Sequence, residues 1–225
     1  MAKYRRLEVL NGIVDSGLVP IFYHEAVSVA GQIVDACATG GARAVEFTNR
    51  GDGAWQVFTT LLEHRRRSQT EIMLGAGSIV DAPTASLYVN SGADFIVGPA
   101  FDGEIAALCN RRKVAYIPGC ATLTEIGNAE AAGVELVKIF PGQLLGPEFV
   151  RAVRGPQPWT NMLVTGGVRP DAASLQAWFE AGATAVGIGS GLIRRDWVTA
   201  GQFDKITQAV AQTCAWINRH RAHHE

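Results

Sequence analysis

The sequence lacks the charge excess, the long apolar run and the paired cysteines that mark several large classes of protein. Charged residues make up 18% of the 225 residues and the formal net charge is −1, so there is no excess charge to attract nucleic acid. No apolar run approaches membrane-spanning length, and residues 1–6 lead into an amphipathic stretch, not an apolar signal core. We therefore expect neither nucleic acid nor a membrane as a partner.

Cysteine is scarce as well. Cys37, Cys109, Cys120 and Cys214 are far apart in the sequence and form no CxxC pair. Most of them fall in apolar helical stripes, which favours reduced core thiols in a cytoplasmic protein. No cluster of His, Cys, Asp and Glu has the spacing of metal ligands, so we expect no metal site.

What the chain has is a regular alternation of strand-like and helix-like segments. A leading amphipathic helix over residues 5–16, with Leu7, Leu10 and Ile13 on one face and Gly17 as its stop, is predicted to cover one end of the fold. Strands are predicted at 18–23, 44–48, 71–74, 95–97, 114–117, 135–141, 162–164 and 185–188. Helices are predicted at 27–37, 54–62, from 81, and at 102–112, 122–132, 147–153, 171–180 and 201–218.

These segments make eight strand–helix units without a change in composition. A faint repeat supports the count, because Gly41, Gly92, Gly133 and Gly182 each end a helix and each is soon followed by a strand. We expect an α/β fold: one (β/α)8 TIM barrel over residues 1–225, with a leading helix at 1–17 and a polar tail at 219–225. An open doubly wound sheet is the alternative, because periodicity does not show closure.

Lysine is unusually rare, and one lysine stands out. The chain has four lysines against sixteen arginines, and three of the four lie in polar surroundings. Lys138 alone lies inside a strand-like run, Glu135–Pro141. An unpaired ammonium among apolar side chains is costly, so Lys138 either extends out at the strand end or is kept for chemistry that needs an amine.

Other reactive side chains follow other strands, and in a barrel the carboxyl ends of all strands meet at the active site. Glu46 and Arg50 end the second strand, Thr165, Gly166 and Gly167 the seventh, and Gly189 and Ser190 the eighth. Glycine loops after strands seven and eight predict an anion site, although the glycines could merely turn the chain. Glu46 could equally be a structural ion-pair partner of Arg50 or Lys138, and His24 is a weak signal for packing or specificity.

An amine, a carboxylate and a guanidinium around one cavity suit Schiff-base chemistry on a keto acid. The amine must be neutral to attack a carbonyl, and burial beside a second cation such as Arg50 favours the neutral form.

With these residues in place, the chain resembles the class I aldolases of 2-keto-3-deoxy-6-phosphogluconate (KDPG) and 4-hydroxy-2-oxoglutarate (KHG). The resemblance covers nearly the whole chain. It rests on an ordered set of motifs: Val19-Pro20, Gly41 with 45–50, 75–78, Pro118-Gly119 with Thr122 and Glu125, 137–141, 165–167 and Gly189-Ser190. The resemblance implies a (β/α)8 barrel, a homotrimer, and no metal or organic cofactor.

The resemblance also implies roles for individual residues. Lys138 forms the Schiff base and Glu46 is the general acid/base. The implied substrate-binding residues are Arg50 and Ser78 for the pyruvyl carboxylate, Phe140, Pro141 and Pro99 for the pocket wall, Thr165 in the same cavity, and Gly166, Gly167, Gly189 and Ser190 for a distal phosphate. Ser78 stands where the family usually has threonine, Gly98 replaces a common serine, and Tyr23-His24 replaces a more aliphatic pair.

The predicted function is reversible cleavage of a 2-keto-4-hydroxy acid into pyruvate and an aldehyde. The substrate is either a phosphorylated 2-keto-3-deoxy sugar acid, which yields glyceraldehyde 3-phosphate, or 4-hydroxy-2-oxoglutarate, which yields glyoxylate. One alternative is a phosphosugar isomerase or epimerase with Glu46 as base and Lys138 as an electrostatic partner. Another is a protein that binds a keto acid or phosphate without turnover.

Overall fold

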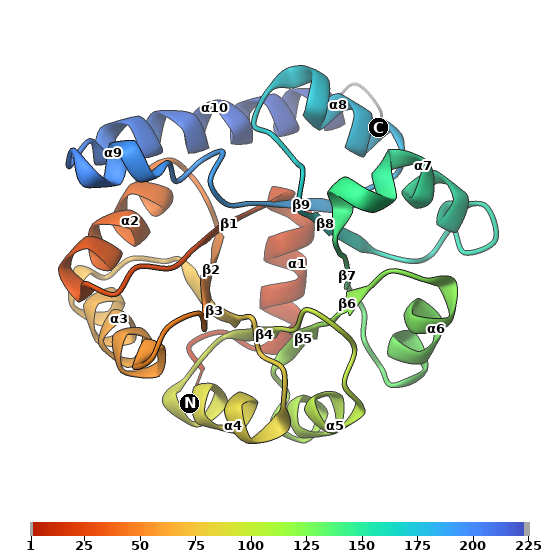
Figure 1. Cartoon of the computed structure of the whole chain (residues 1–225), viewed down its shortest axis with the longest axis horizontal. Helices are drawn as coiled ribbons and strands as arrows, with labels where there is room; N and C mark the ends of the chain where they lie inside the picture. The colour runs from red at the N-terminus through yellow and green to blue at the C-terminus, as the bar shows by residue number, and fades with distance from the viewer. Residues whose placement is uncertain (1, 223–225) are drawn as a thin grey trace.

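Parallel strands alternate with helices along the chain, as the sequence predicts (Figure 1). The structure is a computed structural model and describes residues 2–222. The strands are β1 Leu18–Phe22, β2 Ala44–Thr48, β3 Met73–Gly77, β4 Phe95–Val97, β5 Ala115–Ile117, β6 Gly119–Cys120, β7 Val137–Ile139, β8 Met162–Thr165 and β9 Ala185–Ile188.

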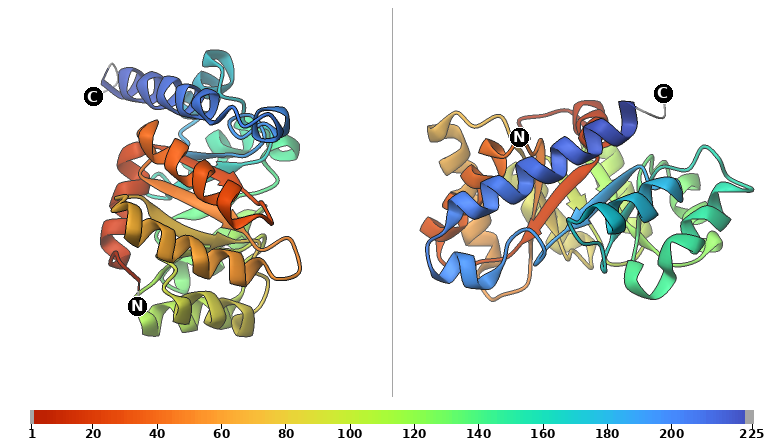
Figure 2. Two further views of the ribbon diagram at one scale, coloured as in Figure 1. Left: turned by 90° about the vertical axis from the view of Figure 1, so that its left-hand side faces the viewer. Right: turned by 90° about the horizontal axis from the view of Figure 1, so that it is seen from above.

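The described helices surround the strands on the outside of the ring, except the first, Arg6–Ser16, which lies across one end of it (Figure 1). They are α1 Arg6–Ser16, α2 Val27–Thr39, α3 Ala54–Ser68, α4 Ala82–Ser91, α5 Gly103–Arg112, α6 Leu123–Ala131, α7 Gly142–Arg154, α8 Ala172–Glu180, α9 Arg195–Thr199 and α10 Phe203–Ala222. The long α10 packs along α2 on one flank of the barrel (Figure 2). No helix in the described part of the chain has the combination of length and apolarity that a membrane crossing needs.

The sheet closes on itself. Its strand order is β5-β4-β3-β2-β1-β9-β8-β7-β6, with every pair parallel. β5 and β6 are two halves of one strand, interrupted at Pro118, which has no N–H to donate. Ile117 O accepts from Gly98 N on one side at 3.2 Å, and Pro118 O accepts from Lys138 N on the other at 2.8 Å. The barrel prediction is confirmed, and the open sheet is excluded.

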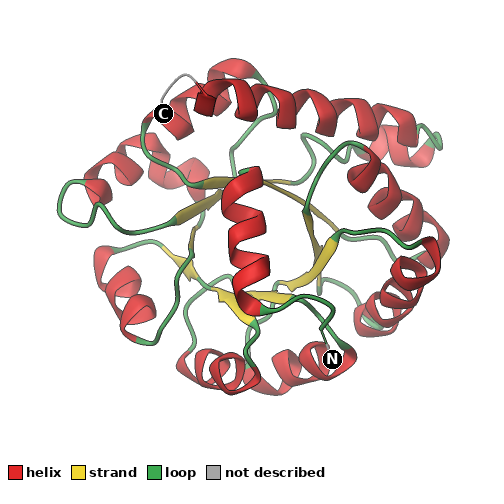
Figure 3. Cartoon of the chain, turned by 180° about the vertical axis from the view of Figure 1, so that it is seen from behind, coloured by secondary structure: helices red, strands yellow, loops and turns green. Residues whose placement is uncertain are grey.

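One end of the barrel is filled by α1, which crosses it in front of the strands (Figure 3). Val9, Leu10 and Ile13 are buried together with the inward-facing side chains of the strands. Gly17 ends the helix with φ 66°, as predicted. The predicted face was partly wrong, because Leu7 is 68% exposed. Leu7 lies two positions before Val9 on the helix, which turns it about 200° away from Val9, toward solvent.

Several predicted boundaries differ from the structure. β3 runs from 73 to 77 and not from 71 to 74, because its glycines carry no apolar signal. α7 begins at Gly142, five residues before the predicted start, and breaks at Gly146, where φ is 72°. The short α9 was not predicted. The expected polar tail is helical as far as Ala222, with His220 stacked on Trp216 at 4.8 Å; residues 223–225, with His223 and His224, lie outside the described residues.

Candidate active site

A cavity of 740 Å³ opens at the carboxyl ends of the strands. Loops after β1, β2, β7, β8 and β9 line it, together with the outer part of α9. Of the residues that the sequence singled out, the lining contains Arg50, Phe140, Thr165, Gly166, Gly167, Gly189 and Ser190. The carboxyl ends of a parallel barrel therefore gather these residues from four different strand ends, those of β2, β7, β8 and β9.

Lys138, on β7, is not itself among the residues that line the cavity, but it lies next to Phe140, which is. It is only 6% exposed, whereas the other three lysines are exposed. Its Nζ lies 5.0 Å from the ring centroid of Phe140, which lines the cavity above it. Within residues 2–222 it makes no ion pair. The structure thus places a buried amine under the cavity, and the interpretation that it extends into solvent is wrong.

Glu46 faces Lys138 across the barrel. β2 and β7 lie four strands apart in either direction round the ring, so their inward side chains meet near the axis. Glu46 is 1% exposed, and its Oε1 packs against Gly77 so closely that no larger residue than glycine fits there. Its Oε2 has no hydrogen-bond partner among the described residues. A buried oxygen without a protein partner is able to bond a substrate or a water molecule at this position.

The charge state of Glu46 is set by competing effects. Burial raises the pKa of Glu46 above its ordinary value, while the positive charges of Lys138 and then Arg50 oppose this rise. Among residues 2–222, neither cation forms an ion pair with Glu46, so the interpretation of Glu46 as a structural ion-pair partner finds no contact to support it. A carboxyl group held toward its protonated form suits proton transfer.

Arg50 and Ser78 meet at the rim next to Glu46. Arg50 follows β2 and is exposed, and its Nε donates to Ser78 Oγ at 3.4 Å. Ser78 follows β3 with φ 58°, a left-handed conformation that is strained for a residue other than glycine. Strained serines of this kind cluster at binding sites, where the fold holds a hydroxyl in a fixed direction.

Thr165 and the glycine loops form the opposite wall. Thr165 Oγ1 is buried without a hydrogen-bond partner among the described residues. It lies close to Gly187 of the neighbouring strand, where an added Cβ atom would approach it to 2.6 Å. Gly166 and Gly167 both have positive φ, at 94° and 74°, so the loop conformation itself requires glycine. The result is a second polar region, away from Arg50.

Three of the predicted binding residues, Ser78, Pro99 and Pro141, are not among the residues that line this cavity. Ser78 reaches it only through its hydrogen bond to Arg50. Pro99 follows β4 and is half-buried, with its carbonyl group against Gly119 of the interrupted strand. The structure therefore puts Ser78 beside the site and Pro99 on the β4–β6 side of the barrel end.

The cavity also contains residues that the sequence did not assign to it. Arg195, Val198 and Thr199 come from α9, and Tyr23 follows β1. A helix of five residues is too short to show a periodic pattern, which is why α9 was missed. The only available signal was its position directly after the glycine loop.

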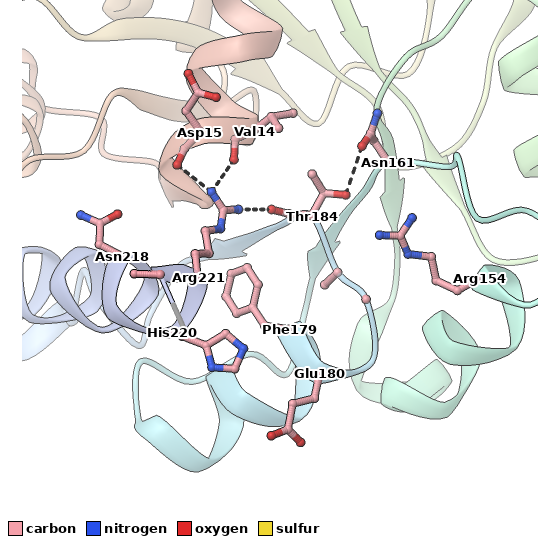
Figure 4. A pocket seen from close by; sticks show the side chains of 13 residues that line it. Val14, Asp15, Arg154, Asn161, Phe179, Glu180, Thr184, Asn218, His220 and Arg221 are labelled. Carbon is pink, nitrogen blue, oxygen red and sulfur yellow. Dashed lines mark hydrogen bonds between the residues drawn. The ribbon is translucent and has the colours of Figure 1, made fainter. Parts of the chain in front are cut away.

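A second cavity, of 910 Å³, lies at the amino ends of the strands (Figure 4). Arg221 dominates it and donates to the backbone oxygens of Val14, Asp15 and Thr184 at 2.6–2.7 Å, with its guanidinium also over the ring of Phe179. These bonds tie the end of α10 to α1 and to the loop before β9. This arginine therefore has a structural role, and the chemistry belongs to the other end of the barrel.

A buried amine and a buried carboxyl group on facing strands, beside a cavity at the carboxyl ends of a (β/α)8 barrel, are the arrangement that an aldolase acting through a lysine requires. The comparison with known sequences gives the family. The chain belongs to the KDPG and KHG aldolase family, whose profile matches residues 10–209.

Individual relatives agree with this assignment. The chain is 29% identical over 197 residues to the 2-dehydro-3-deoxy-phosphogluconate aldolase of Treponema pallidum, covering 87% of this chain and 91% of the relative. It is also 29% identical over 202 residues to the 2-dehydro-3-deoxy-6-phosphogalactonate aldolase of Escherichia coli, covering 88% and 89%. A solved 4-hydroxy-2-oxoglutarate/phosphogluconate aldolase superposes with a TM-score of 0.79 at 27% identity, covering 92% and 97%.

Proposed function

We propose that this chain cleaves a 2-keto-4-hydroxy acid reversibly into pyruvate and an aldehyde, with Lys138 as the nucleophile. The observation that carries this proposal is the buried, unpaired amine of Lys138 opposite Glu46. Family membership favours a lyase over both alternatives, the phosphosugar isomerase and the non-catalytic binding protein.

The reaction follows from the positions of these two groups. Neutral Lys138 Nζ attacks the keto carbon C2, and Glu46 gives a proton to the departing oxygen, so that water leaves and a protonated imine forms. Glu46, now a carboxylate, takes the proton of the C4 hydroxyl. The C3–C4 bond breaks, its electron pair moves toward the imine nitrogen, and an aldehyde and an enamine result. Protonation at C3 and addition of water then release pyruvate and the free lysine.

The remaining residues are assigned to binding. Arg50, held by Ser78, pairs with the carboxylate of the pyruvyl half, because a guanidinium binds a carboxylate through two parallel hydrogen bonds. Phe140 forms the wall beside the imine, and Pro99 supports that end of the barrel. Thr165, with an unpaired buried hydroxyl, faces the hydroxyls of the substrate. Gly166, Gly167, Gly189 and Ser190 receive the distal anion.

Reductive trapping tests the mechanism. We expect borohydride in the presence of pyruvate to add a stable mass to Lys138, detected in the tryptic peptide that contains it. Lys138→Arg is the matched control, because it keeps the charge but forms no imine. An unmodified Lys138, or full activity in Lys138→Arg, contradicts the imine mechanism and supports the isomerase alternative.

The relatives leave open the configuration of the substrate at C4, which distinguishes the phosphogluconate series from the phosphogalactonate series. Equal identities of 29% connect the chain to a phosphogluconate and to a phosphogalactonate aldolase. We propose a phosphorylated substrate, on the support of the two glycine loops. Measuring pyruvate release from phosphorylated and unphosphorylated 2-keto-4-hydroxy acids tests this choice, and equal rates would refute it.

We also propose that residues 1–225 act as one barrel domain that assembles as a homotrimer. Exposed apolar side chains support an assembly surface: Trp55 on α3 is 36% exposed and Leu87 on α4 is 51% exposed. Trp55 Nε1 donates to Ser91 Oγ at 2.8 Å, and Ser91 Oγ donates to Leu87 O, so Trp55 and Leu87 belong to one surface on α3 and α4. Light scattering gives the mass in solution, and a monomeric mass would refute the proposal.

We propose a cytoplasmic location on the basis of the cysteine thiols. Cys37, Cys109 and Cys120 are buried and all four cysteines are free, which suits the reducing cytoplasm. Cell fractionation with an antibody against the chain tests this assignment.

A further inference from the structure

Two adjacent arginines after the last glycine loop have different surroundings. Arg194 forms two hydrogen bonds with the carboxylate of Asp196, both at 3.0 Å, and its guanidinium lies 5.2 Å from the ring centroid of Trp197. Arg195 lines the 740 Å³ cavity. Within residues 2–222, Arg195 has neither a hydrogen-bond partner nor an ion-pair partner. The charge of Arg194 is neutralised locally, and the charge of Arg195 is not.

The charged side chains that line the cavity are all positive. Two guanidinium groups, of Arg50 and Arg195, line the cavity, and no carboxylate is among the described residues that line it. The nearest acid in the mechanism, Glu46, is buried below, with its pKa raised. A concave site with unopposed positive charge concentrates anions, and two separate cations suit a ligand with two anionic groups.

The two cations come from different loops at the opening of the cavity. Arg50 follows β2 and Arg195 follows β9, with β1 between them in the sheet. Two strand spacings separate the ends of β2 and β9 by roughly 10 Å. Arg195 follows the loop of Gly189, Ser190 and Gly191, which the proposed function assigns to the distal anion, whereas Arg50 is assigned to the pyruvyl carboxylate.

We infer that Arg195 determines specificity by binding the distal phosphate of the substrate, in addition to the backbone of the glycine loops. This inference rests on the proposed aldolase function, because it concerns the far end of that substrate. A guanidinium presents two parallel N–H groups to phosphate oxygens, and such charge-assisted pairs are stronger than neutral hydrogen bonds. Arg195 therefore discriminates a six-carbon 2-keto-3-deoxy acid with a terminal phosphate from the same acid with a terminal hydroxyl.

The test compares Arg195→Gln, Arg195→Lys and, as the matched control, Arg194→Gln. Each is assayed for kcat and KM with the phosphorylated acid and with its unphosphorylated counterpart. In Arg195→Gln we expect the ratio of the two kcat/KM values to fall about tenfold or more, mostly through a higher KM for the phosphorylated acid. In Arg195→Lys we expect part of the wild-type ratio of kcat/KM values to be kept, because lysine has the positive charge but not the two parallel N–H groups of a guanidinium. Arg194→Gln keeps the wild-type ratio.

The outcomes separate the inference from the proposed function. Cleavage of both acids by the wild type, with the same ratio in Arg195→Gln and Arg194→Gln, overturns the role of Arg195 and leaves the aldolase intact. No cleavage and no borohydride adduct on Lys138 overturn the proposed function. Calorimetric binding of inorganic phosphate gives a readout without turnover: we expect weaker binding in Arg195→Gln than in Arg194→Gln, and equal binding overturns the inference.

Discussion

At the scale of single residues, Glu46 shows how burial adapts a common side chain to a reaction. The carboxyl group sits opposite the amine of Lys138 without an ion pair among the described residues, and burial outweighs two nearby cations in setting the direction of its pKa shift. A carboxyl group in that condition can give a proton to a departing oxygen and take one back from a hydroxyl.

Glu46→Gln keeps the shape of the side chain but removes the proton transfer. We expect kcat to fall by about a hundredfold or more, the scale of a general acid/base residue. Circular dichroism checks that the fold is intact, and Glu63→Gln, an exposed change on α3, serves as the control. Turnover at the wild-type rate in Glu46→Gln would remove Glu46 from this role.

The raised pKa of Glu46 also has a consequence for stability. A group with a higher pKa in the folded state favours folding below its unfolded pKa, and that contribution is lost as the pH rises through the folded pKa. The amide side chain of glutamine does not ionise, so Glu46→Gln should melt at a higher temperature than the wild type at alkaline pH and at nearly the same temperature near pH 4. Thermal melts across this range measure the difference. A constant difference at all pH values contradicts the shift.

Ser78 combines a useful hydroxyl with a strained backbone. In Ser78→Gly the left-handed φ of 58° costs less, and we expect a gain of about 1 kcal/mol in the free energy of unfolding together with a higher KM. Ser78→Ala loses the same hydroxyl but keeps the strain, so its KM should rise without a gain in stability. Equal stabilities of the two variants would show that the backbone there is not strained.

The sequence identified Lys138, Glu46 and Arg50 because each ends an apolar run, and barrel topology brings the ends of such runs together. It could not distinguish Arg194 from Arg195. The two are adjacent, and only the pairing with Asp196 in three dimensions separates a neutralised cation from one that lines the cavity.

At the scale of elements, α1 closes the end of the barrel at which the strands begin. Its side chains fill the space that the strands leave at their amino ends, where they join the inner core with residues such as Phe95. This contact explains why a helix outside the eight repeated units belongs to the fold.

Ile13→Ala tests the contribution of this helix. Ile13 is fully buried, so we expect the free energy of unfolding to fall by about 2–5 kcal/mol in urea denaturation. Leu7→Ala on the same helix is the matched control, with an expected change within about 0.5 kcal/mol, because Leu7 is 68% exposed. Similar losses in both variants would contradict the burial pattern.

The strand–helix alternation was predictable because most elements carry an apolar face of regular period. The prediction of strand bounds failed at β3, where Gly75 and Gly77 occupy positions that carry apolar side chains in other strands. A Cβ atom at either position would collide with Phe95 or Glu46, so these glycines make room inside the barrel. The residue types inside a strand can thus depend on side chains that pack against it from other strands. The periodicity of the strand's own sequence does not contain this information.

At the scale of the whole molecule, a closed barrel was predicted from the count of strand–helix units and from the family resemblance, but periodicity alone could not distinguish it from an open sheet. The strand that completes the ring is broken at Pro118, and its two short halves, β5 and β6, pair with neighbours that belong to opposite ends of the strand order. Those pairings are made by backbone groups, whose hydrogen bonds leave no signal in side-chain periodicity.

Because α1 closes one end of the barrel, the reaction space has a single exit. In the proposed mechanism the keto-acid half is bonded to the buried Lys138, and the aldehyde half extends toward the opening of the cavity. The two products must then depart in a fixed order, aldehyde first and pyruvate last. In cleavage assays we expect added pyruvate to inhibit competitively with the substrate and added aldehyde to inhibit noncompetitively; the reverse pattern would mean that a second route leads out of the barrel.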